Sequence, residues 1–252
     1  MHIAVISDVH GNVAALDEVL RDAEQHEVSH YWLLGDLVAY GPRPVEVLER
    51  VRRLSHLRCV RGNTDRYVLA GDVGGMIPPI DHPRTPDEHR VLADARESFA
   101  WTRGCLVGSG QYSWLSGLPL EERITLPDGM RVLLVHASPG RDDGWGMHPD
   151  LSDDELAHLG FTGEVADLIF VGHTHVAGER RAAGSYIVNP GSVSLPRDPD
   201  DQARWALVSV TAQGFAIEFR SVAYNLREVV SDLDRQHHPS SGWLRAKMTG
   251  HK

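Results

Sequence analysis

The chain has 252 residues, 42% of them hydrophobic, and a formal net charge of −10 with its histidines neutral. This length suits one large domain or two small ones with a substantial core. Lys and Arg are outnumbered by Asp and Glu and do not run together, which disfavours bulk nucleic acid as a partner but allows a small phosphorylated substrate. Two cysteines predict neither a disulfide framework nor a zinc motif. Without a long apolar stretch or a signal peptide, we expect a soluble, cytoplasmic chain with no membrane contact, and the oligomeric state stays open.

The first predicted strand covers residues 3–6 and ends in a polar turn. It is an apolar run, as expected for a strand covered on both faces. Asp8 and His10 follow at its carboxyl end, where open α/β sheets place ligands. Two interpretations of this stretch are equally good. The two side chains bind a ligand such as a metal ion, or Asp8 caps the next helix and His10 fills a turn.

Two more strands follow, each succeeded by a helix. They are predicted over residues 31–34 and 57–60, and polar turns at Asp36 and Asn63 end them. Asn12 is expected to cap the helix after the first turn. Three strand-and-helix units in succession predict a parallel sheet with right-handed crossovers.

The pattern changes over residues 66–120, which we interpret as a helical insertion. Residues 71–83 are rich in Gly and Pro and are predicted to form a loop. Thr85 and Glu88 form a capping box at the start of a helix that carries Phe99 on its apolar face. The insertion is expected to lie over the carboxyl ends of the strands; the alternative is an ordinary packed helical layer.

Strands return in the second half of the chain. They are predicted over residues 123–126, 131–136, 167–171, 185–188, 205–210 and 215–220. The turn at 127–129 predicts a hairpin of the first two, and a turn at Gln213 and Gly214 predicts an antiparallel pair of the last two. A last helix begins at Asn225, and residues 237–252 are expected to form a loose polar tail.

The polar turns after five of the predicted strands carry side chains that can bind a metal ion. These are Asp8, His10, Asp36, Asn63, His136, His173 and His175. Each alone could be a cap or a hydrogen-bonded turn residue, but coincidence does not explain the whole set. Oxygen and imidazole ligands without a thiolate suit Mn, Fe, Zn, Co or Ni rather than Ca or Mg. The set is too large for one tetrahedral zinc ion and suits two ions about 3.5–4 Å apart.

In these motifs the sequence resembles the calcineurin-like metallophosphoesterases, in particular their compact bacterial and archaeal phosphodiesterase branch. The motifs are Asp8-Val9-His10, Gly35-Asp36, Gly62-Asn63-Thr64-Asp65, Val135-His136, Gly172-His173-Thr174-His175 and Asn189-Pro190-Gly191-Ser192-Val193. The resemblance implies a single metallophosphoesterase domain over residues 1–252. Its implied fold is a four-layer α/β/β/α sandwich of two mixed β-sheets flanked by helices, with the segment 66–120 as a cap-like helical insertion over the active site.

The resemblance also implies a role for each motif residue. The first of two divalent transition-metal ions would be held by Asp8, His10, Asp36 and His175. The second would be held by Asn63, His136, His173 and the bridging Asp36. Mn is the expected metal, with Fe, Zn, Ni and Co as alternatives. The implied enzyme is a phosphodiesterase or phosphatase in which a metal-bridging hydroxide attacks phosphorus, while Asp36 bridges the ions and Asn63 orients the phosphate.

One position departs from the family pattern. Many members have His where this chain has Thr64, and that His protonates the leaving group or orients the phosphate. Thr is a poor general acid but can donate a hydrogen bond to a phosphate oxygen, so we expect a preference for good leaving groups, such as aryl or nucleotide-like esters. Other candidate substrate contacts are Tyr40, Arg43 and Ser138. Asp65 is expected to cap the next helix, and Arg66 to be solvated.

Two alternative functions are possible on the same fold. The first is a metal-binding protein-interaction scaffold with weak or no catalysis, as in the retromer subunit that resembles this family. The departure at Thr64 favours it, whereas the complete set of ligands does not. The second is a nuclease of the same superfamily, which would need a basic groove and a longer accessory domain. The acidic balance and the modest length of the chain argue against it.

Overall fold

The computed structural model describes residues 1–71, 85–197, 200–211 and 214–249. The first sheet has the order β10-β9-β1-β2-β3. Its strands are β1 (His2–Ile6), β2 (His30–Leu33), β3 (Leu57–Cys59), β9 (Ala203–Thr211) and β10 (Gly214–Val222). The parallel pairing of β1, β2 and β3 was predicted and is confirmed. Strand β9 runs antiparallel to both β1 and β10, which makes the sheet mixed. Of the predicted turn between β9 and β10, residue 213 lies outside the described residues.

The second sheet has the order β4-β5-β6-β8-β7. Its strands are β4 (Glu121–Thr125), β5 (Arg131–Val135), β6 (Leu168–Phe170), β7 (Gly178–Ala182) and β8 (Ser185–Asn189). The predicted hairpin is the antiparallel pair β4 and β5. Strands β5, β6 and β8 are parallel, so their carboxyl ends share one edge with each other. This sheet is therefore mixed as well.

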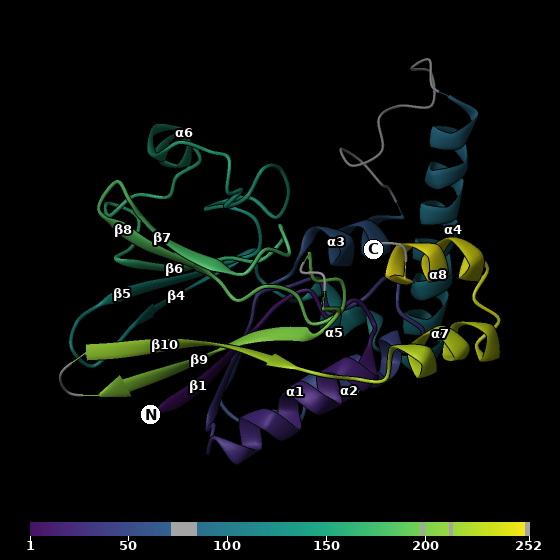
Figure 1. Ribbon diagram of the computed structural model, residues 1–252, viewed down its shortest axis with the longest axis horizontal. Helices are drawn as coiled ribbons and strands as arrows, with labels where there is room; N and C mark the ends of the chain where they lie inside the picture. The colour runs from purple at the N-terminus through teal and green to yellow at the C-terminus, as the bar shows by residue number, and fades with distance from the viewer. Residues whose placement is uncertain (72–84, 198–199, 212–213, 250–252) are drawn as a thin grey trace.

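Helices cover the outer faces of both sheets, which confirms the predicted sandwich (Figure 1). The helices are α1 (Val13–Gln25), α2 (Pro44–Val51), α3 (Asn63–Ala70), α4 (Pro86–Ser109), α5 (Tyr112–Ser116), α6 (Asp153–His158), α7 (Leu226–Arg235) and α8 (Ser241–Thr249). Helices α1 and α2 lie against the first sheet, and α6 lies beyond the second. The predicted cap of α1 is present, because Asn12 Oδ1 accepts a hydrogen bond from the Ala15 amide at 3.1 Å.

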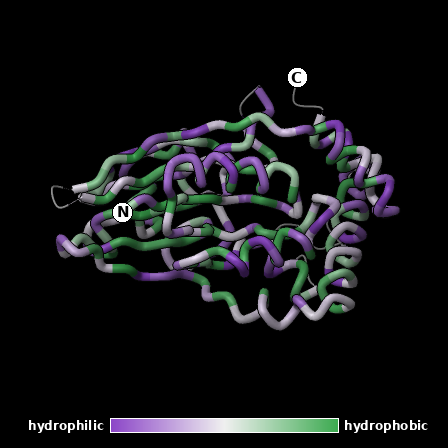
Figure 2. Tube along the Cα trace, turned by 90° about the horizontal axis from the view of Figure 1, so that it is seen from below, coloured by the Kyte–Doolittle hydropathy of each residue, from purple (hydrophilic) through white to green (hydrophobic). Residues whose placement is uncertain are grey.

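The alternation of side chains along β1 explains why this strand is apolar throughout. Ile3 and Val5 belong to the cluster between the two sheets, which also holds Phe170 of the second sheet. Ala4 and Ile6 belong to the cluster under the helices on the opposite face. Figure 2 shows hydrophobic stretches along the central strands and mixed colouring along the helices. A strand buried on both faces holds its carboxyl end rigidly, and that end carries the candidate ligands.

Helix α4 dominates the described part of the segment 66–120, which the sequence predicts to be an insertion. It is 24 residues long and begins after the predicted capping box of Thr85 and Glu88. Phe99 on this helix contacts the ring of Tyr40, with ring centroids 5.6 Å apart. The predicted loop 71–83 lies, except for Gly71, outside the described residues. In the described part of the chain, no helix is both long and apolar enough to cross a bilayer.

The stretch 237–252 is not a loose tail in its described part, contrary to expectation. It contains α8, whose Leu244 and Met248 are buried in the main core. Their spacing of four residues gives only a narrow apolar stripe, too short for a clear sequence signal. His238, within this expected tail, is 3% exposed, and its ring lies tilted against that of Trp101 with the centroids 4.5 Å apart. Helices α4, α7 and α8 form a helical end of the molecule (Figure 1).

Candidate metal centre

The carboxyl ends of strands from both sheets meet at one cavity of about 590 Å³. The residues that line it are His10, Asp36, Tyr40, Asn63, Thr64, Gly144, Trp145, His148, His173, Thr174, His175, Val176, Leu195, Arg197 and Lys247. Two predicted ligands, Asp8 and His136, are fully buried directly behind this lining. The structure therefore brings all the predicted ligands together, although they come from segments up to 167 residues apart.

One group of donor atoms comprises Asp8, His10 and His175. Asp8 Oδ1 lies 3.2 Å from His175 Nε2 and 3.9 Å from His10 Nε2. The two Nε2 atoms lie 3.3 Å apart. Asp8 Oδ1 and His10 Nδ1 are buried and have no hydrogen-bond partner among the described residues. A cation between these atoms would satisfy the carboxylate, whose desolvation is otherwise costly.

A second group lies beside the first and contains Asp36, Asn63, His136 and His173. Asn63 Oδ1 lies 2.9 Å from His136 Nε2 and 3.0 Å from His173 Nδ1. Asp36 Oδ2 lies 3.4 Å from His136 Nε2 and 3.7 Å from His10 Nε2 of the first group. The same Asp36 oxygen therefore faces donors of both groups. Asp8 also faces both, because its Oδ1 is 4.0 Å from His136 Nε2.

Backbone carbonyls orient three of the imidazoles toward the cavity. His136 Nδ1 donates to Leu34 O at 2.7 Å, and His175 Nδ1 donates to Leu195 O at 2.7 Å. His173 is turned the other way, with Nε2 donating to the Gly144 carbonyl at 2.8 Å. With a metal ion bound, the nitrogen that faces the carbonyl would keep its proton, and the other nitrogen would offer its lone pair to the ion.

The electrostatics of the buried groups also fit a bound cation. Burial opposes ionisation of Asp8, but His175 and His136 outweigh it and lower the pKa of Asp8 to about 2. The pKa of Asp36 is likewise lowered, because His136 and His10 outweigh its burial. Burial alone would lower the pKa of His136, yet Asp36 raises it to about 10. Two buried carboxylates thus favour positive charge between them, which divalent ions can supply.

The backbone of the ligand loops adopts a conformation that most residues avoid. Asp8, His10, Asp36, His173 and His175 have φ of 57°, 49°, 52°, 68° and 60°. This left-handed region costs energy for residues with a Cβ, although Asp and His tolerate it better than most. Their amides are tied across the loops, as His10 N donates to Asp36 O at 2.8 Å. Strain of this kind is typical of functional sites.

Glycine is required where two carboxylates approach neighbouring backbone. A Cβ on Gly62 would overlap the carboxylate and the amide of Asp36, and one on Gly172 would overlap Ser7 Oγ and Asp8 Oδ2. Asp36 Oδ1 accepts a hydrogen bond from the Thr64 amide at 2.8 Å, near the start of α3. Because this bond occupies Oδ1, Oδ2 is left to face the imidazoles.

Asp65, on α3, clamps the loop that carries Asp36. Its carboxylate accepts hydrogen bonds from the amides of Gly62, Leu37 and Val38 at 2.9, 3.0 and 3.1 Å. The bond from Gly62 is the predicted cap. Burial and the charge of Asp36 raise the pKa of Asp65 to about 7.

The predicted substrate contacts are placed differently from one another. Tyr40 and Thr64 line the cavity, but the Thr64 hydroxyl donates to Val38 O at 3.1 Å. Arg43 instead points to the helical end, where Asp232 and Glu46 bind its guanidinium. Ser138 is buried and does not line the cavity. Only two of the four candidates therefore face the space above the candidate ligands.

Several cavity residues were not predicted from the sequence. Trp145 and His148 come from the segment after His136, where Gly and Asp residues obscure any periodic pattern. Arg66, expected to be solvated, tethers this segment through ion pairs to Asp142 at 2.8 Å and to Asp143 at 2.7 Å. Arg197 and Lys247 also line the cavity and stand outside every motif. In the sequence, only the rarity of lysine marks Lys247, since Lys247 and Lys252 are the two lysines of the chain.

Comparison with known proteins identifies the family. Residues 1–213 match the model of the calcineurin-like phosphoesterase superfamily domain. The chain belongs to the calcineurin-like phosphoesterase superfamily. This phosphoesterase is therefore a hydrolase that acts on ester bonds, and its family implies divalent metal ions. The family match ends before α7 and α8.

Relatives of this phosphoesterase extend over most or all of its length. An uncharacterized protein of Methanocaldococcus jannaschii is 30% identical, covering 98% of this chain and 96% of its own. The structure of a metallophosphoesterase from Sphaerobacter thermophilus is 30% identical with a TM-score of 0.74, covering 100% of both chains. The phosphodiesterase YfcE of Escherichia coli K12 is 25% identical, covering 78% of this chain and 82% of its own.

Proposed function

We propose that this phosphoesterase holds two divalent metal ions and hydrolyses phosphodiesters or phosphomonoesters. The observation that carries the proposal is that Asp36 Oδ2 faces imidazole nitrogens of both donor groups, at 3.4 and 3.7 Å. The first ion would be held by Asp8, His10, Asp36 and His175. The second would be held by Asp36, Asn63, His136 and His173. Asp36 would therefore be shared, because its Oδ1 accepts a hydrogen bond from the Thr64 amide while its Oδ2 faces the imidazoles.

The donor set favours a particular group of metals. Carboxylate, amide and imidazole ligands without a thiolate suit Mn, Fe, Zn, Co and Ni, and we propose Mn. When bound, such ions supply a hydroxide nucleophile at neutral pH and neutralise negative charge on the phosphoryl group. The chain itself keeps the imidazoles in position through the carbonyls of Leu34, Leu195 and Gly144.

The cavity favours substrates with good, planar leaving groups. The Thr64 hydroxyl stays protonated at any working pH and already donates to Val38 O, so it is a poor proton source for a leaving group. Trp145 lines the cavity with 66% of its surface exposed, and its ring lies 6.0 Å from the ring of His148. An exposed indole can stack on an aryl or nucleobase group. We therefore propose aryl or nucleotide-like phosphodiesters as the preferred class.

Replacing the shared ligand tests this proposal. After reconstitution with Mn²⁺, we expect the wild type to hold about two ions per chain and to hydrolyse bis(p-nitrophenyl) phosphate. Asp36→Asn should lower the rate by about a thousandfold or more, because the amide leaves one donor position neutral and disturbs both ions. Asp17→Asn is the matched control, since Asp17 lies on α1 in an exposed pair with Arg50. Circular dichroism reports whether each variant is folded.

Retained activity in folded Asp36→Asn would contradict the shared-ligand assignment. A metal content well below two ions per chain would contradict the two-ion proposal. The scaffold alternative is favoured by Thr64, whose hydroxyl is directed to Val38 rather than to the cavity centre. It predicts a protein that binds both ions yet hydrolyses no phosphodiester or phosphomonoester in a broad screen.

A further inference from the structure

Lys247, on the last described helix, lines the metal cavity although it lies beyond the family match. Its Nζ lies 5.3 Å from the centroid of the Tyr40 ring and 5.7 Å from that of Trp243. The Tyr40 ring in turn lies 5.1 Å from the ring of His10. One aromatic ring therefore separates the lysine ammonium from a candidate metal ligand. These contacts hold the ammonium by its attraction to two ring faces rather than by a carboxylate.

Arg197 lines the same cavity and increases its positive charge. Within the part of the chain that the structure describes, neither side chain forms a hydrogen bond or an ion pair. Burial lowers the pKa of Lys247, and the nearby charge of Arg197 lowers it further. Among the described residues that line the cavity, Asp36 alone carries a carboxylate, in a chain whose net charge is −10. Two neighbouring cations that no described carboxylate pairs with are costly unless an anion binds between or beside them.

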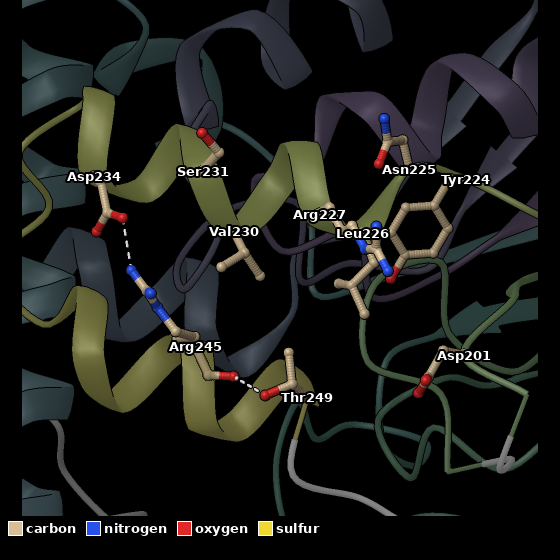
Figure 3. A pocket seen from close by; sticks show the side chains of 10 residues that line it. All are labelled: Asp201, Tyr224, Asn225, Leu226, Arg227, Val230, Ser231, Asp234, Arg245 and Thr249. Carbon is tan, nitrogen blue, oxygen red and sulfur yellow. Dashed lines mark hydrogen bonds and ion pairs between the residues drawn. The ribbon is translucent and has the colours of Figure 1, made fainter.

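The position of α8 directs Lys247 to the cavity. Leu244 and Met248 pack into the core. Arg245 faces the other way, toward a cavity between α7 and α8, where it pairs with Asp234 at 2.6 Å (Figure 3). Successive helical residues are about 100° apart, so Lys247 points about 200° away from Arg245. The helix is thus anchored on one side and presents its lysine on the other.

We propose that Lys247 and Arg197 bind a second anionic group of the substrate, next to the phosphoryl group that is hydrolysed. The inference rests on the proposed function and narrows it to esters that carry at least two phosphoryl groups. The Tyr40 ring separates Lys247 from His10. Arg197 lines the same cavity two residues after Leu195, whose carbonyl binds His175. A substrate with a single phosphoryl group would occupy only the space beside the ion ligands, so Lys247 would act as a specificity-determining residue.

Binding of AMP and ADP tests this inference, because the two ligands differ by one phosphoryl group. Both are titrated by calorimetry into the full-length, metal-loaded protein. We expect wild type to bind ADP at least about tenfold more tightly than AMP, the gain of one charge-assisted hydrogen bond. Lys247→Gln should reduce this ratio toward one while changing the AMP affinity less than about threefold. Arg197→Gln should reduce the ratio in part.

Two further variants separate charge from folding. Lys247→Arg keeps the positive charge and should retain part of the preference for ADP. Arg53→Gln removes a cation from an exposed turn after α2 and should leave both affinities unchanged. Metal content and melting temperature are measured for every variant. Equal loss of AMP and ADP affinity in folded Lys247→Gln, or no change in the ratio, would overturn the inference.

Hydrolysis of bis(p-nitrophenyl) phosphate by the same preparations separates this inference from the proposed function. A wild type that discriminates ADP from AMP but hydrolyses nothing would contradict the phosphoesterase proposal and support the second anion site. A wild type that hydrolyses the diester but binds AMP and ADP equally would support the phosphoesterase proposal and contradict the second anion site.

Discussion

Two cavities of similar size differ in how their polar groups are satisfied. The metal cavity has a volume of about 590 Å³, and the cavity between α7 and α8 has about 640 Å³. At the first, Asp8 Oδ1 and His10 Nδ1 are buried without a hydrogen-bond partner among the described residues. At the second, Arg245 is bound by Asp234, and no described lining residue has a buried, unpartnered side-chain atom (Figure 3). Volume alone would not distinguish them.

The difference indicates which cavity is built for a ligand. Buried polar atoms without partners and left-handed ligand loops cost free energy, and a bound ion can recover it. At the helical end, Asp232 pairs with Arg43 and Arg235, and Asp234 pairs with Arg245, so these charges hold α7 and α8 in place. Substitutions at the metal cavity should mainly change metal binding, and substitutions at the helical end should mainly change the free energy of unfolding.

The largest effect is expected from adding one methyl group beside Asp36. In Gly62→Ala, the Cβ would overlap the carboxylate and the amide of Asp36. We expect the loop to shift, with an unfolding free energy lower by about 1–3 kcal/mol and with loss of metal binding and activity. Urea unfolding and metal analysis of the reconstituted protein measure the two effects.

Gly108→Ala is the control for this change. Gly108 lies within α4, and a Cβ there meets no atom within 4 Å. Alanine is the better helix former, so the free energy of unfolding of this variant should rise by about 0.5–1 kcal/mol. Its activity should stay at the level of wild type. If Gly62→Ala binds metal and turns over substrate like wild type, the tight packing around Asp36 is not needed for the site.

The sequence predicted the ligand set because each ligand follows a local pattern. Buried strands such as β1 and β6 are short apolar runs, and polar residues such as Asp8 and His173 directly follow them. Parallel strands of one sheet end at a common edge, so the pattern grouped the candidate ligands that follow β1, β2 and β3. The candidate ligands that follow β5 and β6 belong to the second sheet, so the local pattern did not by itself place them beside the others. The existence of two sheets required the family resemblance, because strand pairing between distant segments leaves no local signal.

The rest of the cavity depends on contacts that no local pattern encodes. Lys247 and Trp145 reach it only because α8 and the segment after His136 pack at particular angles. Arg43 shows the reverse error, since it follows a ligand loop closely in sequence yet turns to Asp232, 189 residues away. Proximity in sequence to a ligand was therefore a poor guide to substrate contacts.

A pH-dependent effect on stability is expected at the helical end. His238 Nδ1 accepts a hydrogen bond from the Ser240 amide at 3.2 Å, and burial lowers the pKa of His238 to about 4. Between pH 6.5 and 4 the unfolded state binds more protons than the folded state, so this contribution to stability falls as the pH falls. The loss should reach up to roughly 3 kcal/mol near pH 4 and stay constant below it.

Urea unfolding of variants isolates this histidine from the metal ligands. In His238→Gln, the free energy of unfolding should fall less steeply between pH 6.5 and 4 than it does in wild type. His237→Asn, at an exposed position with φ of 51°, should keep the slope of wild type, because Asn tolerates the left-handed backbone. The same slope in wild type and His238→Gln would mean that His238 titrates normally in the folded state.

The smallest effect is expected from Arg43, which tests whether a residue next to the ligand loop serves the substrate or the fold. Its guanidinium binds Asp232, whose side chain is 9% exposed, and Glu46. Arg43→Gln should lower the unfolding free energy by about 1–2 kcal/mol, between the values of exposed and buried pairs. KM for bis(p-nitrophenyl) phosphate should stay within about twofold, since the side chain does not reach the cavity.

Arg50→Gln provides the comparison for this pair. Arg50 binds Asp17 at 3.0 Å, but both side chains are more than a third exposed, at 39% and 37%. Water screens such a pair, so its removal should cost less than about 0.5 kcal/mol. A larger loss for Arg43→Gln than for Arg50→Gln, with KM unchanged in both, would assign Arg43 to anchoring α7. A KM that rises several-fold only in Arg43→Gln would instead show that Arg43 contacts the substrate. The helical end would then contribute to substrate binding as well as to stability.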